Sequence, residues 1–225
     1  MTRKAFWLTL TACLCVGSPA RAQLGLNLFR KPNIADVFKP VVGKGGVYET
    51  VRAKDGTKHS LEMTIIGKES VDGKEAYWME VAHDQDRSGQ VSYAKMLLTK
   101  EDFQARRMIF QQPGKPAMEF PMNFNAAGKN SLKHQEELEK WHQIGSESIT
   151  VPAGTFSCQH WQKEDGKGDA WISDKVSPFG VIKMVSPTET MTLVKVINDA
   201  KDHISGPVQQ FDPQLLRQQM MEQNQ

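Results

Sequence analysis

Cys158 and His160 are the one pair whose residue types and spacing suggest metal chemistry. On a strand, positions i and i+2 share a face, and a thiolate beside an imidazole suits zinc or copper. Such a site needs one or two further ligands, for which only His142 and His203 are candidates. Because two ligands alone rarely make a site, we interpret Cys158 and His160 as ordinary strand residues and expect no bound metal.

Motifs for catalysis are absent from the sequence. It contains no His-Glu-x-x-His, Cys-x-x-Cys or Gly-x-Ser-x-Gly. The run Ser173-Asp174-Lys175 has the residue types of a nucleophilic site, but Ser and Asp are also typical turn residues. We therefore expect neither an enzyme nor a cofactor, with enzymatic or metal chemistry around Cys158 and His160 as the least favoured alternative.

Residues 1–22 predict a secretory signal peptide. Arg3 and Lys4 give a positive start, Ala5 to Gly17 is mostly apolar, and Ala20-Arg21-Ala22 fits the small-x-small cleavage pattern. The apolar run is too short to cross a bilayer comfortably, and no second run of membrane length follows. We expect an exported, periplasmic protein without a transmembrane span.

Leu10-Thr11-Ala12-Cys13 leaves a second route to the envelope open, because it resembles the lipobox at which bacterial lipoproteins are acylated on Cys. Anchoring through Cys13 is thus the alternative localisation. Cleavage after Ala22 removes three basic residues and leaves 25 basic against 26 acidic ones, a net charge of −1 that excludes bulk attraction to nucleic acid. It also leaves Cys158 as a lone thiol, which we expect to be buried.

From residue 46 the chain predicts short strands separated by turns. Asp55-Gly56 and Asp72-Gly73 are typical hairpin turns. Leu61, Met63 and Ile65 alternate with polar residues, as in a strand. The expected strands cover 46–53, 59–66, 75–82, 90–99, 105–112, 117–124, 143–151 and 189–198, with further strands between 149 and 185, and 100–103 as one helical turn.

These patterns divide the chain into a lead-in segment at 23–45, a β-rich domain at 46–206 and a C-terminal helical tail at 207–225. The lead-in has a short helical run at 34–38 that Pro40 ends, and the tail has a helix from 214 to 222. Residues 130–142 fit either a helix or a polar strand, and we favour a loop that leads into a strand.

Many short strands and few helices predict a mainly β fold. Three runs add a resemblance: Val151-Pro152-Ala153-Gly154-Thr155-Phe156, Trp171-Ile172-Ser173 and Pro178-Phe179-Gly180-Val181. They resemble uncharacterised exported bacterial proteins with curved antiparallel sheets similar to the outer-membrane lipoprotein carriers. The resemblance implies a single curved antiparallel sheet, an open or half barrel, with one or two short helices, and an envelope protein that holds an acyl chain.

Several expected strands are apolar on both faces, so the sheet must curl around its own core, a covering segment or a ligand. Our first hypothesis is an apolar or lipid-like ligand held in the curved sheet. The alternative is an envelope protein partner bound through a sheet edge or the C-terminal tail. The aromatic and Met residues that we name as candidate pocket lining are Tyr77, Trp78, Met79, Phe110, Phe120, Met122, Trp161, Trp171, Phe179 and Met184.

Overall fold

The structure is a computed structural model that describes residues 37–84, 90–120, 140–204 and 206–211. The predicted signal peptide with Cys13, the candidate pocket residue Met122, residues 130–139 and the predicted helix from residue 214 lie outside the described residues. No helix within the described ranges is long and apolar enough to cross a membrane.

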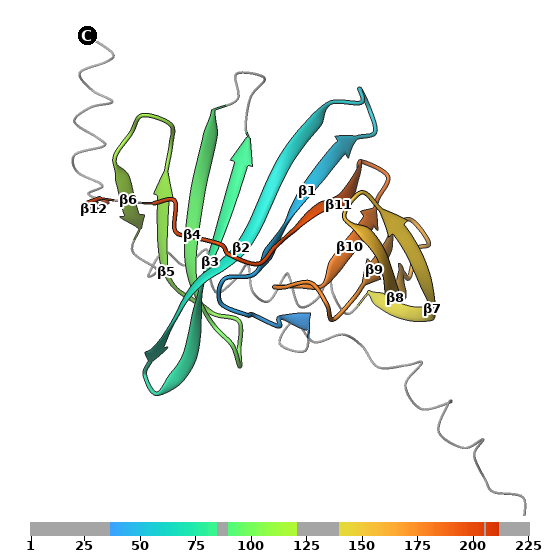
Figure 1. Cartoon of the computed structure of the whole chain (residues 1–225), viewed down its shortest axis with the longest axis horizontal. Coiled ribbons are helices and arrows are strands. Elements are labelled where there is room, and N and C mark those ends of the chain that lie inside the picture. Colours follow the sequence, from blue (N-terminus) through green and yellow to red (C-terminus); the bar gives the residue numbers. More distant parts are fainter. Residues whose placement is uncertain (1–36, 85–89, 121–139, 205, 212–225) are drawn as a thin grey trace, which may run out of the picture.

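One twelve-stranded sheet forms the body of the protein (Figure 1), with the order β12-β6-β5-β4-β3-β2-β1-β11-β10-β9-β8-β7. All neighbours pair antiparallel except β12 and β6, which are parallel. The strands are β1 (Gly45–Arg52), β2 (Lys58–Val71), β3 (Lys74–Asp84), β4 (Val91–Thr99), β5 (Ala105–Gln111), β6 (Ala117–Phe120), β7 (Trp141–Val151), β8 (Gly154–Lys163), β9 (Asp169–Ile172), β10 (Val181–Val185), β11 (Glu189–Ile197) and β12 (Val208–Gln210).

Local sequence explains the hairpins. The β2–β3 turn places Asp72 and Gly73 at φ 51° and 76°, as a two-residue turn with positive φ at both positions requires. This turn sets the register in which Val71 pairs with Lys74 and Gly67 with Trp78, and an irregularity between Ile65 and Gly67 then shifts the pairing so that Ile65 lies opposite Met79. The single, curved antiparallel sheet implied by the resemblance is confirmed.

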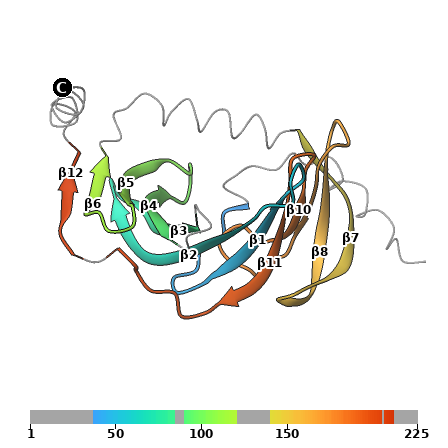
Figure 2. The same ribbon diagram turned by 90° about the horizontal axis from the view of Figure 1, so that it is seen from above.

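The sheet bends into a trough that stays open, as the view along it shows (Figure 2). We call the concave side the inner face and the convex side the outer face. The chain from β11 to β12 crosses the outer face in both views. Strand β3, under this segment, is therefore covered on both sides: Tyr77 and Met79 pack in one core cluster, whereas Trp78 packs in another.

Two clusters fill much of the interior. The first gathers around the fully buried Tyr48, Ile182 and Leu193, where β1, β10 and β11 meet. The second gathers around Phe38, whose ring contacts Tyr77, Phe103 and Phe179, with the centroids of Phe38 and Phe103 5.0 Å apart. Phe38 is 1 % exposed, so the end of the lead-in segment belongs to the core.

The structure differs from the sequence predictions in several places. Residues 100–104 form the β4–β5 turn instead of a helical turn, with Phe103 at φ 50°. Strand β2 runs to Val71, five residues beyond its predicted end. Strand β12 was not predicted, because three exposed residues of Val-Gln-Gln carry no alternating pattern. Of the one or two short helices, the described ranges contain only one helical residue, Val37.

Candidate ligand site on the inner face

Strand pairing brings a strip of Met and Phe side chains together on the inner face. Met79 is an inner residue, and it pairs with Met96, which pairs with Met108. Residues directly opposite in antiparallel strands project to the same side of the sheet. Applied once more to β5 and β6, this rule places five residues side by side: Met96, Met108, Phe110, Met118 and Phe120.

These five side chains, which we call the Met-Phe strip, are all half-buried. Their counterparts nearer the middle of the sheet are more enclosed, because Phe38 and Phe179 pack over Tyr77 and Met79. The inner face is thus closely packed around Phe38, where Tyr77, Met79 and Leu98 are buried, and carries half-buried apolar side chains on β5 and β6. Thioethers adapt to irregular apolar partners, and a Met-rich surface suits a ligand of variable shape.

The predicted pocket residues divide into separate groups. Tyr77, Met79 and Phe179 share the Phe38 cluster, while Trp171 and Met184 pack against the other cluster. Phe110 and Phe120 belong to the Met-Phe strip.

The two remaining described candidates lie elsewhere. Trp78 is on the outer face, with Lys95 Nζ 5.0 Å and the Arg107 guanidinium carbon 5.1 Å from its ring centroid. Trp161 is opposite Ala170 on β9. The sequence analysis did not select Met96, Met108 or Met118. The alternation of β4 and β5 marks them as same-face residues, but their meeting depends on the strand register.

Cys158 and His160 do not converge on a common point. His160 stands between two carboxylates, with Nδ1 3.0 Å from Glu147 Oε1 and Nε2 2.9 Å from Asp169 Oδ1. Its ring stacks on Trp171 at a centroid distance of 4.5 Å. The Cys158 thiol contacts the Phe156 carbonyl oxygen at 3.5 Å instead. No group of three His, Cys, Asp or Glu side chains in the described part of the chain could hold a metal ion.

The further ligand candidates are also placed apart. His142 is exposed on β7, whereas His203 follows β11 and contacts Glu80. The thiol of Cys158 is 2 % exposed. Burial raises its pKa, and the charge of Glu147 raises it further, so the thiol is the stable form.

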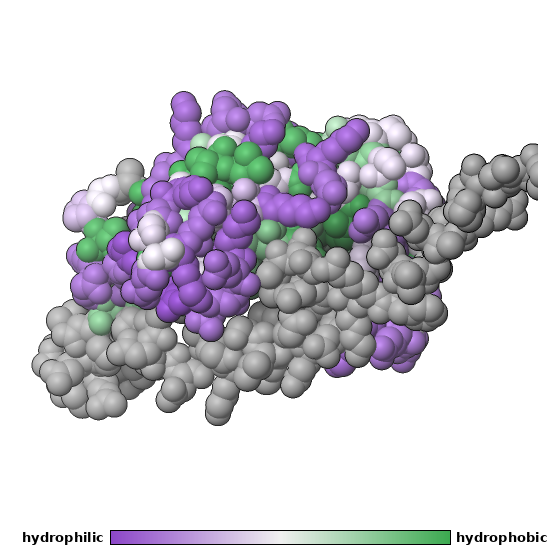
Figure 3. Space-filling model, turned by 90° about the horizontal axis from the view of Figure 1, so that it is seen from below, coloured by the Kyte–Doolittle hydropathy of each residue, from purple (hydrophilic) through white to green (hydrophobic). Residues whose placement is uncertain are grey.

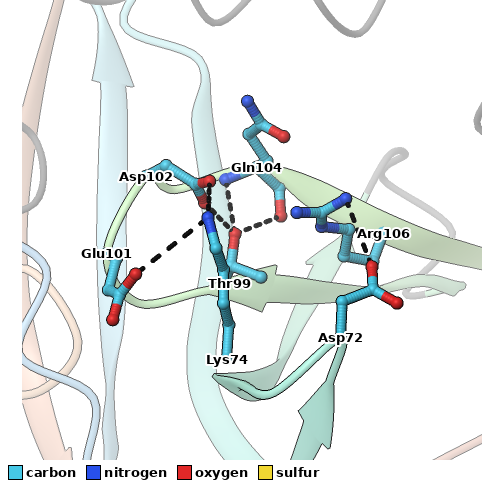
Figure 4. Close-up of polar contacts among 7 residues, drawn as sticks. All are labelled: Asp72, Lys74, Thr99, Glu101, Asp102, Gln104 and Arg106. Atoms are coloured by element: carbon cyan, nitrogen blue, oxygen red, sulfur yellow. Dashed lines mark hydrogen bonds and ion pairs between the residues drawn. The ribbon is translucent and has the colours of Figure 1, made fainter.

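A polar network ties the β2–β3 hairpin to the β4–β5 turn (Figure 4). Lys74 Nζ lies 2.9 Å from Asp102 Oδ2 and 4.0 Å from Glu101 Oε2. The Thr99 hydroxyl donates to Asp102 and accepts a hydrogen bond from the backbone N–H of Gln104 at 3.1 Å. These contacts fix the end of the two hairpins that carry Met79, Met96 and Met108.

The surface seen from the lower side of Figure 1 has apolar patches separated by hydrophilic side chains (Figure 3). Large apolar side chains that are clearly exposed in the described residues are few and scattered: Val41, Val42, Ile144 and Val208. The gathering of partly accessible apolar groups on β4–β6 is therefore the feature that we take as the candidate site.

No protein-family model and no curated protein matches this chain. Two solved structures are similar in part. A candidate lipoprotein from Parabacteroides distasonis is 15 % identical with a TM-score of 0.38, and the match covers 71 % of this chain and 97 % of that one. A candidate exported protein with a YmcC-like fold from Bacteroides fragilis is 10 % identical with a TM-score of 0.37, covering 71 % and 98 %.

Proposed function

We propose that this protein is exported to the cell envelope, in the periplasm or anchored through Cys13, and binds an apolar, lipid-like ligand on the Met-Phe strip. The signal peptide pattern supports export. The strip supports the ligand class, because it offers thioethers and aromatic rings and no charged side chain of its own.

The observation that carries the proposal is the difference between the two parts of the inner face. Around Tyr77 and Met79 the protein supplies its own cover, since Phe38 is 1 % exposed and packs against Phe103 and Phe179. Over β4–β6 the side chains of Met108 and Phe110 remain half-buried. Covering such residues with an acyl chain gains about 25 cal/mol for each Å² of apolar surface removed from water.

Binding of a fluorescent long-chain fatty acid to the purified chain tests the proposal. Phe110→Lys places a charge in the strip, and we expect it to weaken binding at least about tenfold, because a buried ammonium without a partner is costly. Gln111→Lys is the matched control. It adds the same charge at the neighbouring position of β5, whose side chain points to the other face.

Native mass spectrometry of gently extracted protein gives a second measurement, in which we expect a co-purified lipid that Phe110→Lys has lost. Equal fatty-acid affinity in the original protein, Phe110→Lys and Gln111→Lys would refute the strip as the site. The absence of both co-purified lipid and measurable fatty-acid binding would refute the function.

Protein interaction at a sheet edge is the second candidate function. Strand β7 ends the sheet order, spans eleven residues and contains no Lys, Arg or Pro, the residues that usually protect an edge. Because β7 and β8 are joined by a two-residue loop, every second residue of β7, starting from Val151, bonds to β8. The backbone N–H and C=O groups of Ser146, Ser148 and Thr150 point away from β8, toward the free edge. Ser148→Pro removes one outward N–H, so it should abolish capture of an envelope partner that Ser148→Ala retains.

A further inference from the structure

The chain after β11 crosses the outer face as a strap, which we define as residues 199–204 and 206–211 (Figures 1 and 2). Ile204 anchors its middle, since it is 7 % exposed and packs with Ile109 and Ala117. At its end, Phe211 stacks on Phe120 with ring centroids 4.8 Å apart, and its N–H donates to the Glu119 carbonyl at 2.9 Å. The strap thereby holds β12 against β6.

A buried carboxylate lies under the strap. Glu80 on β3 is 1 % exposed, and its two oxygens contact one strap residue. Oε1 lies 2.6 Å from His203 Nδ1, and Oε2 accepts the backbone N–H of His203 at 3.2 Å. The imidazole is 43 % exposed and stacks on Tyr93 of β4 at 5.1 Å. A carboxylate so deeply buried requires both partners to stay bonded.

The net charge of the cluster around Glu80 depends on one proton. Lys95 is its cross-strand neighbour on β4, Thr64 is its neighbour on β2, and Asp202 on the strap pairs with Lys95. Two carboxylates, Glu80 and Asp202, thus face one ammonium. The cluster is neutral when the Glu80–His203 pair holds one additional proton, on either the carboxylate or the imidazole, and carries one negative charge without it.

We propose that the strap is a pH-sensitive element, docked most tightly when the Glu80–His203 pair holds this proton and loosened as pH rises and the proton leaves. Loosening releases β12 and Phe211, and so uncovers the edge of β6 beside the Met-Phe strip. The pH effect does not rest on ligand binding, because the Glu80–His203 contacts lie on the outer face of β3 and β4, whereas the end of the strap, where Phe211 stacks on Phe120, touches the Met-Phe strip.

The direction of the effect follows from linkage. Burial raises the pKa of Glu80, and the hydrogen bonds from His203 act against this without cancelling it. The docked strap therefore binds a proton more readily than an undocked strap that leaves Glu80 in water. Docking is strengthened on the acid side of this raised pKa and weakened as pH passes through it.

Hydrogen exchange of the strap from pH 4.5, the ordinary pKa of a glutamate, to pH 8.5, corrected for the intrinsic exchange rate, tests the proposal. We expect the protection factor of peptides covering residues 199–211 to fall at least about fivefold across this range, the lower end of typical coupling between linked equilibria. Peptides from the β7–β8 hairpin serve as the internal reference, and their protection should stay constant.

Three variants distinguish an effect of protonation from a general loss of strap stability. Glu80→Gln keeps both contacts, because the amide oxygen accepts the backbone N–H and the amide N–H can donate to Nδ1 of the other imidazole tautomer. We expect its strap to be protected equally at both pH values. His203→Ala should lower strap protection most at pH 8.5, and Glu80→Gln combined with His203→Ala should recover it. Strap protection that is independent of pH in the original protein, or that keeps its pH dependence in Glu80→Gln, would overturn the proposal.

Discussion

Asp102 allows the strongest quantitative prediction. Burial acts to raise the pKa of Asp102, but hydrogen bonds from Lys74 and Thr99 and the charge of Lys74 together outweigh burial. The pKa is therefore lowered from 3.8 to about 2. At about 1.36 kcal/mol per pKa unit, the ionised carboxylate contributes at most ~2.4 kcal/mol. The side chains of Lys74 and Asp102 are 37 % and 30 % exposed, so solvent screening reduces the expected contribution to about 1 kcal/mol.

The substitution to make is Asp102→Asn, which keeps the shape and an acceptor for Thr99 but removes the charge that faces Lys74 (Figure 4). Urea denaturation at pH 7 should show a loss of about 1 kcal/mol in the free energy of unfolding. Because a lowered pKa stabilises the fold above the unfolded value and loses this effect as pH falls, the gap should be equal at pH 7 and 5. At pH 3, between the two pKa values, about half of it should remain.

Glu101→Gln is the control for Asp102→Asn. Its carboxylate reaches the same ammonium but lies 4.0 Å away and is 70 % exposed, so the change should stay within about 0.5 kcal/mol. A loss for Asp102→Asn that is the same at pH 7 and pH 3 would show that shape, and not charge, holds the turn. No loss at pH 7 would refute the network as a stabilising contact.

Three further outcomes are expected. Native Cys158 should not react with a thiol reagent at pH 8 but should react fully after unfolding in urea, since it is 2 % exposed and burial raises its pKa; a fast native reaction would contradict its placement. Gly45→Ala should cost about 2–4 kcal/mol by denaturant titration, because a Cβ there would lie 2.1 Å from the Met63 carbonyl oxygen. Gly145→Ala, where nothing lies within 4 Å of the added Cβ, should change stability by less than about 0.5 kcal/mol, and equal losses at both glycines would refute the close approach. Ile182→Ala removes a side chain of 0 % exposure and should lower the free energy of unfolding by about 2–5 kcal/mol, which thermal unfolding would detect as a lower Tm.

Local patterns in the sequence account for most strands and hairpins. The Asp72-Gly73 pair predicts a tight turn because both residues tolerate positive φ, and the turn has that geometry. Alternation at Leu61, Met63 and Ile65 predicts the strand that forms β2. These features depend on neighbours within a few residues, which is the distance over which a single sequence carries information.

The candidate site could be located only once the register between the strands was known. Trp78 and Met79 are adjacent in a run of apolar residues, and the sequence analysis placed both in one pocket. In the structure they face opposite sides of β3, since successive strand residues alternate. Which side is the inner one follows from Phe38 packing on Tyr77, a contact between segments that no local pattern connects.

The sequence by itself determined a leader pattern, a series of short strands with identifiable turns, and a mainly β chain with apolar residues on both strand faces. The tertiary structure alone decided that β1 pairs with β11, that the strap crosses over Glu80, and that Met96, Met108 and Phe120 meet. The physical reason is that strand propensity and turn conformation are local, whereas pairing, burial and charge compensation depend on which distant segments share a surface.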